Sequence, residues 1–497
     1  MSRKIRLIAI LLAMATLLSL LVGCNNAPSG NEATEGKGNE NKTEATQALE
    51  GSEIATEEEF KPDVEEKNYG KEFYLAIMGD VNAPDYHWVK ESSNNALTDA
   101  VYRRQELVRD HIGVEIIGTV TENEGRYIEP FKNAVKNKDG SVDLLISHVY
   151  YGIDGFITGN YLTDFKDIPE INLDAPYWRY SVMEGIAAKD HFYLGFSDFN
   201  IFYTHVIAYN KELLSRYEDQ LDENIYSTVE NYRWTLDKFM WLAGLVHIDE
   251  TADGKTDDDT YGFAGKMYRN IGYAGFIQAC NIQLVDQDDS GNYVSSIYLE
   301  KNKEKMANIV DKFYNFVRSE SVLMPNKAPS PSVANGRALM QTISTYALSD
   351  LLQYDVEFGV LPYPMYDENQ KGVGYRHLQW GGYLCMPSYL ADATMAAETI
   401  ELLSYYSDDV NIAFYEKMLG KQVADVPQDR RMLDIVWDGI CYEMGQTYYS
   451  LIKDKNNYLY TLEILTEEST TTNLASYVAT TQGSINKKLK KFFASVK

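Results

Sequence analysis

The fold class follows from residues 72–119, which read EFYLAIMGDVNAPDYHWVKESSNNALTDAVYRRQELVRDHIGVEIIGT. Glu72 to Met78 has the β-branched and aromatic content of a strand. Apolar residues between Asn95 and His111 recur on one helical face, and Val114 to Thr119 predicts a second strand. Strand, helix and strand in this order form a βαβ unit with a parallel sheet and a right-handed crossover.

Later segments continue this pattern. Val142 to Ser147 (VDLLIS) is a continuous apolar run, which predicts a strand buried on both faces. Further strands are expected at His205 to Tyr209 and at Glu357 to Leu361. Long amphipathic helices are expected at Lys303 to Arg318 and at Met395 to Tyr406. The sequence therefore predicts an α/β protein.

Residues 1–23 have the layout of an export signal. Arg3, Lys4 and Arg6 precede an apolar stretch from Leu7 to Val22. As a helix, this stretch of about 16 residues spans roughly 24 Å, which is short of the ~30 Å hydrocarbon core of a bilayer. We therefore interpret residues 1–23 as a cleaved signal peptide and expect no permanent transmembrane helix there.

The sequence LVGC at residues 21–24 resembles the lipobox of bacterial lipoproteins, in which the cysteine is acylated and becomes the mature first residue. Two or more acyl chains hold a protein stably on a membrane, where one would not. The alternative is an ordinary signal peptide with a chance cysteine. Residues 24–66 are predicted to be the lipidated Cys24 and a disordered leash, because Phe60 is the only aromatic residue there and apolar residues are scarce.

The length and composition of the residues after the predicted leash limit how this part of the chain can fold. About 430 residues exceed the size at which a single core stops growing, so at least two domains are expected. A hydrophobic content of 45% is sufficient for real cores, and a net charge of −27 argues against nucleic acid as a partner. Cys280, Cys385 and Cys441 lie far apart in mostly apolar settings, which indicates buried thiols, with one disulfide as the alternative.

Five segments carry a resemblance to a known family. They are DFKDIPEINLDAPYW (164–178), VIAYNKELL (206–214), ENYRWTLDKF (230–239), NGRALM (335–340) and FGVLPYPMYDENQ (358–370). In this order and spacing they resemble the extracellular solute-binding protein family 1 of ABC transporters, which includes maltose-binding and other sugar receptors. The segments cover nearly all of the folded part. The family's Pro-Lys-Tyr is replaced by Pro364-Met365-Tyr366.

The resemblance implies a two-lobed, periplasmic-binding-protein-like α/β fold, with a ligand cleft between lobes that crossing strands join. Crossings are then expected near Val206 and Pro362. Lobe 1 would comprise 67–205 plus 362–407, and lobe 2 would comprise 206–361 plus 408–497. Ligand would be buried between the lobes when a hinge closes.

The function that the resemblance implies is that of an extracytoplasmic receptor, which delivers a mono- or oligosaccharide to the permease subunits of an ABC importer. With the lipid anchor, this places the protein on the outer face of the cytoplasmic membrane of a Gram-positive bacterium. The 38 tyrosines agree with a sugar ligand, because flat aromatic rings cover the apolar faces of sugars and phenol groups bond their hydroxyls. Tyrosine-rich surfaces without any ligand are the alternative.

Placement in the family fold selects candidate ligand-binding residues, because parallel α/β lobes bind at the carboxyl ends of their strands. Candidates follow the first strand (Asp80) or the third strand (His148, Tyr150 and Tyr151), precede the first crossing (Asp198 and Tyr203), or lie in an aromatic loop of the second lobe (Tyr268). Trp380, directly before Gly381-Gly382, is the strongest candidate. The alternative is that Trp380 is a core residue at the interface between the domains. Trp178 and Trp234 are expected to be packing residues.

An acidic loop at residues 249–259 partly matches an EF-hand. Asp249, Asp253, Gly254, Lys255 and Asp257 occupy its positions 1, 5, 6, 7 and 9. Position 12 should be a bidentate glutamate and is Thr260, although Asp258 and Asp259 could substitute in a shortened loop. We favour a solvated acidic turn over a structural calcium site, and expect no cofactor and no other metal.

An enzyme is not expected. The sequence has no G-x-S-x-G, H-E-x-x-H, G-x-x-x-x-G-K-[ST] or G-x-G-x-x-G motif, and its seven histidines are scattered. Two alternatives remain open. A lipid-anchored glycoside hydrolase needs only two suitably spaced carboxylates, which 73 acidic residues could supply. A partner that presents a ligand to a membrane sensor would have the same binding fold.

Overall fold

The computed structural model describes most of the folded part of the chain. The described residues are 60–79, 84–93, 95–121, 127–148, 151–200, 204–265, 267, 272–324, 332–379, 381–424, 426–451 and 461–496. Pro62–Lys497 forms one compact unit. The predicted signal peptide, Cys24 and nearly all of the predicted leash therefore lie outside the described residues. Within those residues, no helix has the length and apolar content needed to cross a membrane.

The first sheet contains the predicted βαβ unit. Its strand order is β13 (Leu384–Cys385), β3 (Leu144–Ile146), β1 (Lys71–Met78) and β2 (Val114–Thr121). β1 is parallel to β2 and to β3, whereas β13 is antiparallel to β3. The three strands expected from the sequence are confirmed, and β13 joins them from far along the chain.

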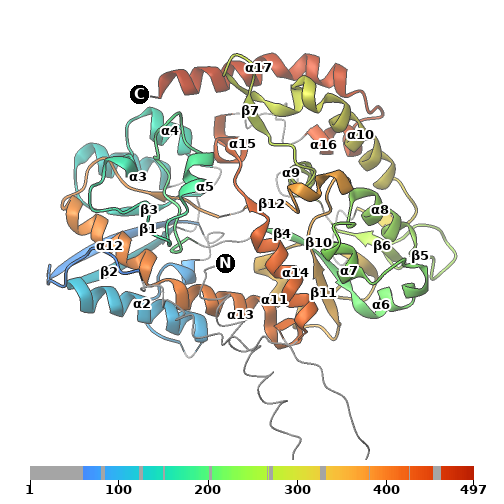
Figure 1. Ribbon diagram of the computed structural model, residues 1–497, viewed down its shortest axis with the longest axis horizontal. Coiled ribbons are helices and arrows are strands. Elements are labelled where there is room, and N and C mark those ends of the chain that lie inside the picture. Colours follow the sequence, from blue (N-terminus) through green and yellow to red (C-terminus); the bar gives the residue numbers. More distant parts are fainter. Residues whose placement is uncertain are drawn as a thin grey trace, which may run out of the picture. The chain divides into compact units, whose positions relative to one another are not determined.

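Helix α2 (Ala96–Ile112) connects β1 to β2, and its ends explain its length. The Asn95 side chain accepts a hydrogen bond from the backbone N–H of Leu97, which caps the first turn. Gly113 ends the helix in the left-handed conformation, with φ of 66°. The other helices around this sheet in Figure 1 are α3 (Ile128–Asn137), α4 (Ile153–Thr158), α5 (Tyr180–Gly185) and α12 (Ala393–Tyr405).

The second sheet is mixed. Its order is β11 (Phe358–Leu361), β4 (His205–Asn210), β10 (Ala338–Ser344), β6 (Thr260–Ala264) and β5 (His247–Ile248), and β9 (Val322–Leu323) also pairs with β6. β10 is antiparallel to β4 but parallel to β6. The strands expected at 205–209 and 357–361 are therefore confirmed as neighbours in one sheet.

Helices and one hairpin surround this second sheet (Figure 1). They are α6 (Lys211–Ser215), α7 (Ile225–Glu230), α8 (Leu236–Gly244), α9 (Ala274–Ala279), α10 (Glu300–Phe316), α11 (Leu348–Leu351) and α14 (Pro427–Asp438), with the hairpin β7 (Val285–Gln287) and β8 (Tyr293–Ser295). Helix α13 (Asp408–Ala424) contacts both α2 and α11. The long helices expected near 303–318 and 395–406 are confirmed as α10 and α12.

Tryptophans in the motif segments are buried packing residues. The indole N–H of Trp234 donates to the carbonyl of Pro362 over 2.8 Å, and the ring is fully buried. The indole N–H of Trp178 donates to the buried carboxylate of Glu401 over 2.8 Å. Both assignments agree with the packing role expected from the sequence.

Two segments that connect the sheets run antiparallel to each other. Asn200 donates from its side chain to Gly382 O over 2.9 Å, and the Thr204 hydroxyl donates to Leu378 O over 2.6 Å. The third connecting segment is β14 (Ile440–Cys441), which pairs in parallel with β12 (His377–Leu378). We call the described residues within 197–205, 377–383 and 440–444 the crossing segments.

Residues after Pro362 pack beside the second sheet. Met365 N donates to Trp234 O over 3.1 Å, and the Tyr375 hydroxyl donates to Val229 O over 2.8 Å. Residues 362–376 therefore pack with the helices around the second sheet. The division into lobes stays a prediction, and these contacts favour a boundary near residue 377.

The carboxyl-terminal part of the chain contacts the surroundings of both sheets. Its helices are α15 (Met444–Thr447), α16 (Thr461–Glu463) and α17 (Leu474–Ser495), the last of which runs along the upper edge of Figure 1. Near the first sheet, Lys189 donates to Val496 O over 2.6 Å and the Tyr448 hydroxyl donates to Ile186 O over 2.9 Å. Near α10, Arg318 donates to Ser469 O over 3.2 Å.

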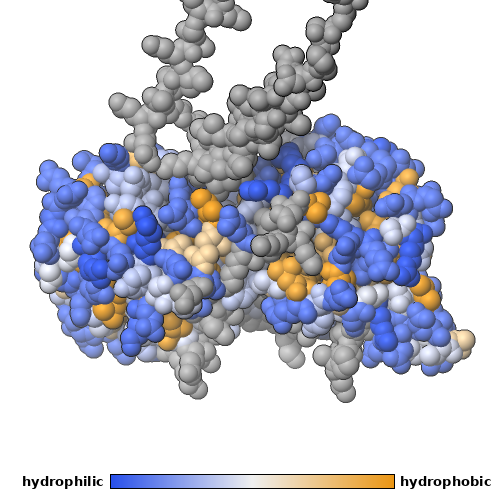
Figure 2. Space-filling model, turned by 90° about the horizontal axis from the view of Figure 1, so that it is seen from below, coloured by the Kyte–Doolittle hydropathy of each residue, from blue (hydrophilic) through white to orange (hydrophobic). Residues whose placement is uncertain are grey.

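The molecular face seen from below in Figure 2 is largely hydrophilic, with hydrophobic residues in separate spots. This distribution agrees with the acidic composition of the chain, whose net charge is −27.

Candidate functional site

Asp198 lies at the start of the first crossing segment, where the sequence placed it. Its carboxylate pairs with Arg179 over 2.5 Å, and Asn411 donates to its backbone carbonyl over 3.0 Å. Burial raises the pKa of Asp198 to about 6, against the opposing effect of Arg179. The pair brings opposite charges together beside the crossing segments.

His148 and Tyr151 are neighbours after β3. Their ring centroids are 4.8 Å apart, at an interplanar angle of 51°. Burial lowers the pKa of His148 to about 4, so the imidazole is neutral at physiological pH. The predicted grouping of these two residues at the end of the third strand is thus observed, whereas their contact with a ligand stays a prediction.

The second crossing segment carries buried polar side chains that the sequence analysis missed. His377 and Gln379 are both fully buried. His377 has one ring nitrogen 3.1 Å from His205 O, while its Nε2 atom has no partner. Both side-chain amide atoms of Gln379 also have no partner. Buried polar groups are nearly always paired, so this segment is unusual.

The third crossing segment borders a polar cavity of about 190 Å³. The cavity is lined by Glu184, Gly185, Gln283, Val285, Asp286, Gln287, Tyr293, Tyr442, Glu443 and Met444. Residues near the first sheet, residues of the β7–β8 hairpin and the crossing segment thus contribute to one space. The Tyr442 hydroxyl is buried and has no partner.

Glu443 fixes the third crossing segment to β7. One carboxylate oxygen accepts from Leu284 N over 2.7 Å and Val285 N over 2.8 Å, and the other accepts from Gln446 N over 2.8 Å. Burial nevertheless raises the pKa of Glu443 to about 7, because desolvation outweighs these hydrogen bonds. The residue therefore acts as a structural clamp whose charge depends on pH.

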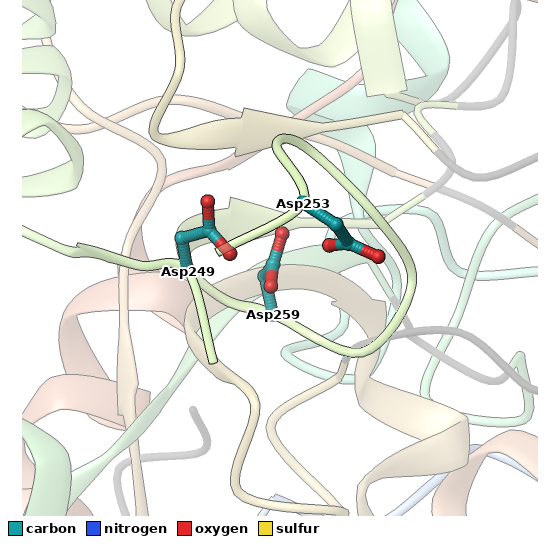
Figure 3. Close-up of side chains that lie close together, drawn as sticks. All are labelled: Asp249, Asp253 and Asp259. Atoms are coloured by element: carbon teal, nitrogen blue, oxygen red, sulfur yellow. The ribbon is translucent and has the colours of Figure 1, made fainter. Parts of the chain in front are cut away.

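Figure 3 shows the acidic loop before β6, where the side chains of Asp249, Asp253 and Asp259 converge. One oxygen from each carboxylate lies within 4.8 Å of the others. Asp259 is buried and accepts from Thr256 N over 2.8 Å and from Glu250 N over 3.1 Å. These bonds, chiefly the one from Thr256, lower the pKa of Asp259.

The oxygen donors of this loop are of the kind that Ca²⁺ prefers. Asp257, expected at position 9, is not part of the converging group, whereas Asp259 is. Asp249 accepts from Gly254 N over 3.1 Å, so the loop also bonds its own backbone. The preference for a solvated acidic turn over a calcium site stays a prediction.

Comparison with known proteins identifies the fold of this chain. Neither a protein-family model nor a curated protein matches the sequence. The cyclic α-maltosyl-1,6-maltose-binding protein from Arthrobacter globiformis is 13% identical, with a TM-score of 0.57 over 84% of this chain and 99% of that one. An ABC substrate-binding protein from Listeria monocytogenes, in complex with cycloalternan, is 11% identical, with a TM-score of 0.54 over 84% and 99%. This chain has the ABC substrate-binding protein fold.

A third structure shares the substrate-binding protein fold with a ligand of another kind. UgpB from Mycobacterium tuberculosis, in complex with glycerophosphocholine, is 14% identical, with a TM-score of 0.53 over 85% of this chain and 98% of that one. The expected two-lobed α/β architecture is therefore confirmed, and at these identities the likeness shows the fold alone.

Within the substrate-binding protein fold, five of the eight predicted ligand-binding residues lie outside the described residues. These are Trp380, Asp80, Tyr150, Tyr203 and Tyr268. Of the other three, His148 and Tyr151 lie together and Asp198 lies at the first crossing. Gln379 and Tyr442 were missed, although a glutamine directly before the favoured Trp380 was a signal that could have been used.

Proposed function

We propose that this protein is an extracytoplasmic solute-binding receptor that delivers a carbohydrate to an ABC importer. The observation that carries the proposal is the substrate-binding protein fold over most of the chain, together with buried polar side chains on the segments that join its sheets. Ligands of this fold are held between two lobes, where hydrogen-bonding groups meet an enclosed space. The similar structures named for cycloalternan and for a cyclic maltosyl-maltose support a sugar.

The proposed site extends beyond the described residues. Trp380 stacks on a sugar ring, because an indole covers the apolar face of a pyranose. Asp80, Tyr150, Tyr203 and Tyr268 supply further contacts, together with His148, Tyr151 and Asp198. The hydroxyls of a sugar would bond the carboxylates and phenols of this set.

Attachment to the membrane is proposed to depend on Cys24. Residues 1–23 direct export and are removed, and acyl chains on Cys24 hold the protein on the outer face of the cytoplasmic membrane of a Gram-positive bacterium. Residues 25–66 form a leash of about 42 residues with a root-mean-square reach of roughly 35–40 Å. This reach lets the receptor meet the permease subunits of the importer.

A ligand screen tests the proposed function. The protein without residues 1–61 is melted alone and with maltotetraose, mannotriose or glycerophosphocholine, which are named with similar structures. A ligand at 100 times its dissociation constant stabilises the folded protein by about 2.7 kcal/mol. We expect a sugar to raise the melting temperature. Stabilisation by glycerophosphocholine but by no mono- or oligosaccharide would contradict a carbohydrate receptor, and sugar cleavage in the same mixtures would indicate a hydrolase.

A further inference from the structure

Gln379 and Tyr442 are neighbours on two of the crossing segments. In the parallel pair of β12 and β14, His377 lies opposite Ile440 and Leu378 lies opposite Cys441. The next pair in this register is Gln379 and Tyr442, and Gln379 N donates to Cys441 O over 3.1 Å. Side chains at paired positions of neighbouring strands lie on the same face. The Gln379 amide and the Tyr442 phenol therefore start from adjacent positions on one face.

Gln379 and Tyr442 together have three buried polar atoms without a hydrogen-bond partner. Gln379 is 0% exposed, and neither its amide oxygen nor its amide nitrogen has a hydrogen-bond partner. The Tyr442 hydroxyl is likewise buried without a partner. By contrast, Gln370 is also buried, but donates to Ala279 O over 2.7 Å and accepts from Tyr366 N over 3.2 Å. Unpaired buried groups destabilise a fold, so each needs an explanation.

The surroundings of Tyr442 indicate what these groups would bind. Tyr442 lines the 190 Å³ cavity, to which residues on both sides of the crossing contribute. Arg179 and Asp198 act on its hydroxyl with opposite signs, and they neutralise each other as an ion pair. The cavity lining also contains three acidic residues, Glu184, Asp286 and Glu443, so it is rich in hydrogen-bond acceptors and suits a neutral ligand with hydroxyl donors better than an anion.

We infer that Gln379 and Tyr442 together bind two adjacent hydroxyl groups of the ligand and thereby select for a vicinal diol. This inference rests on the proposed receptor function. An amide donates through its nitrogen and accepts through its oxygen, and a phenol does both through one atom. Each hydroxyl of a diol also donates and accepts, so all three unpaired atoms gain partners. A site built to bond hydroxyls rejects analogues that lack them, because its own groups are then left unpaired.

Stability in the absence of ligand provides the first arm of the test. Gln379→Met and Tyr442→Phe remove unpaired polar atoms while keeping most of the side-chain volume. We expect each to raise the ligand-free melting temperature by about 1–3 °C. Gln370→Met and Tyr375→Phe are matched controls, because their polar atoms have partners and the Tyr375 hydroxyl donates to Val229 O over 2.8 Å. Both controls should lower the melting temperature.

Affinity provides the second arm. Titration calorimetry uses whichever of maltotetraose and mannotriose stabilises the wild type more. Gln379→Met should weaken binding by about tenfold or more and Tyr442→Phe by severalfold, whereas both controls should stay within about twofold of the wild type. A higher melting temperature together with a weaker sugar affinity is not expected of residues that act only in packing.

The outcomes separate the diol site from the proposed function. Higher stability with unchanged sugar affinity would show that the unpaired groups do not contact the ligand, and would overturn the diol site while the receptor function stands. Lower ligand-free stability of both variants would show that the groups have partners, which also overturns it. Failure of the wild type to bind either sugar would refute the carbohydrate receptor and the diol site with it, and is recognised before any variant is compared.

Discussion

Replacing Glu443 with glutamine should remove a pH-dependent part of the stability of this protein. The carboxylate is buried and clamps the third crossing segment to β7 through backbone N–H groups of Leu284 and Val285. Its pKa is about 7 in the folded protein against an ordinary value of 4.5. Each pKa unit between the folded and unfolded states is about 1.4 kcal/mol, so the linked free energy is on the order of 3 kcal/mol.

The sign of the effect follows from proton binding. Between pH 4.5 and 7 the folded protein holds a proton on Glu443 that the unfolded chain has lost. The free energy of unfolding therefore falls as pH rises through this window. The contribution is fully present below the unfolded pKa and is lost once the pH exceeds the folded pKa. Asp198 and Asp143, whose pKa values burial raises to about 6, act in the same direction.

Urea denaturation at pH 5 and at pH 8 measures this term. The wild type should lose about 3 kcal/mol more than Glu443→Gln between the two pH values, because the amide cannot ionise and other titrating groups cancel in the difference. Glu300→Gln is the control, since that side chain is exposed, and should keep the wild-type pH dependence. If Glu443→Gln showed the same pH dependence as the wild type, burial of Glu443 would not control its protonation.

Three further variants test other parts of the molecule. Cys24→Ser should leave the protein folded but release it from the membrane fraction, and retention after detergent-free washing would identify residues 7–22 as the anchor. Trp380→Ala should weaken sugar binding at least tenfold in calorimetry with a small change in melting temperature, because aromatic anchors cost about 2 kcal/mol or more when truncated; unchanged affinity with a large stability loss would make Trp380 a core residue. Glu401→Ala should destabilise by about 3 kcal/mol or more in urea denaturation, since it removes the buried carboxylate that accepts from the Tyr177 hydroxyl and the Trp178 indole N–H in the core; a loss below 1 kcal/mol would contradict this role.

Local patterns in the sequence predicted the first sheet well. α2 carries its own start and end signals in Asn95 and Gly113, and apolar runs mark β1, β2 and β3. The pairing of β13 with β3 could not be predicted, because Leu384–Cys385 is only two residues long and lies more than 200 residues after β3. Such pairing depends on the assembled fold, not on local propensity.

The position of the second crossing shows a different limit. Pro362 and Pro364 predict an extended segment, which was interpreted as a rod between lobes. Tyr363 between them is instead buried, with its ring stacked on Phe276 at a centroid distance of 4.5 Å. The prolines thus fix an extended backbone as expected, but what that backbone packs against is set by residues far away in the sequence.

The candidate site could be predicted only in outline. Asp198 was placed before the first crossing by its position in the family fold, and the structure finds it buried and paired with Arg179. For Gln379 the only signal was its position directly before Trp380, and Tyr442 offered none, since a glutamine and a tyrosine in a sequence do not show whether their polar atoms will find partners. Burial and pairing are properties of the assembled chain.

Unpaired polar groups on the crossing segments are best explained by function. Each costs about 1–3 kcal/mol, whereas a whole domain is stable by only about 5–15 kcal/mol. Leucine or phenylalanine at Gln379 and Tyr442 would avoid that cost, and the clamp at Glu443 shows that the same segment satisfies buried oxygens where a structural role requires it. Buried polar atoms that lack hydrogen-bond partners within the folded chain are expected at sites where a bound molecule supplies those partners. Under the proposed receptor function that partner is the ligand, so selection for binding would maintain the unpaired atoms of Gln379 and Tyr442.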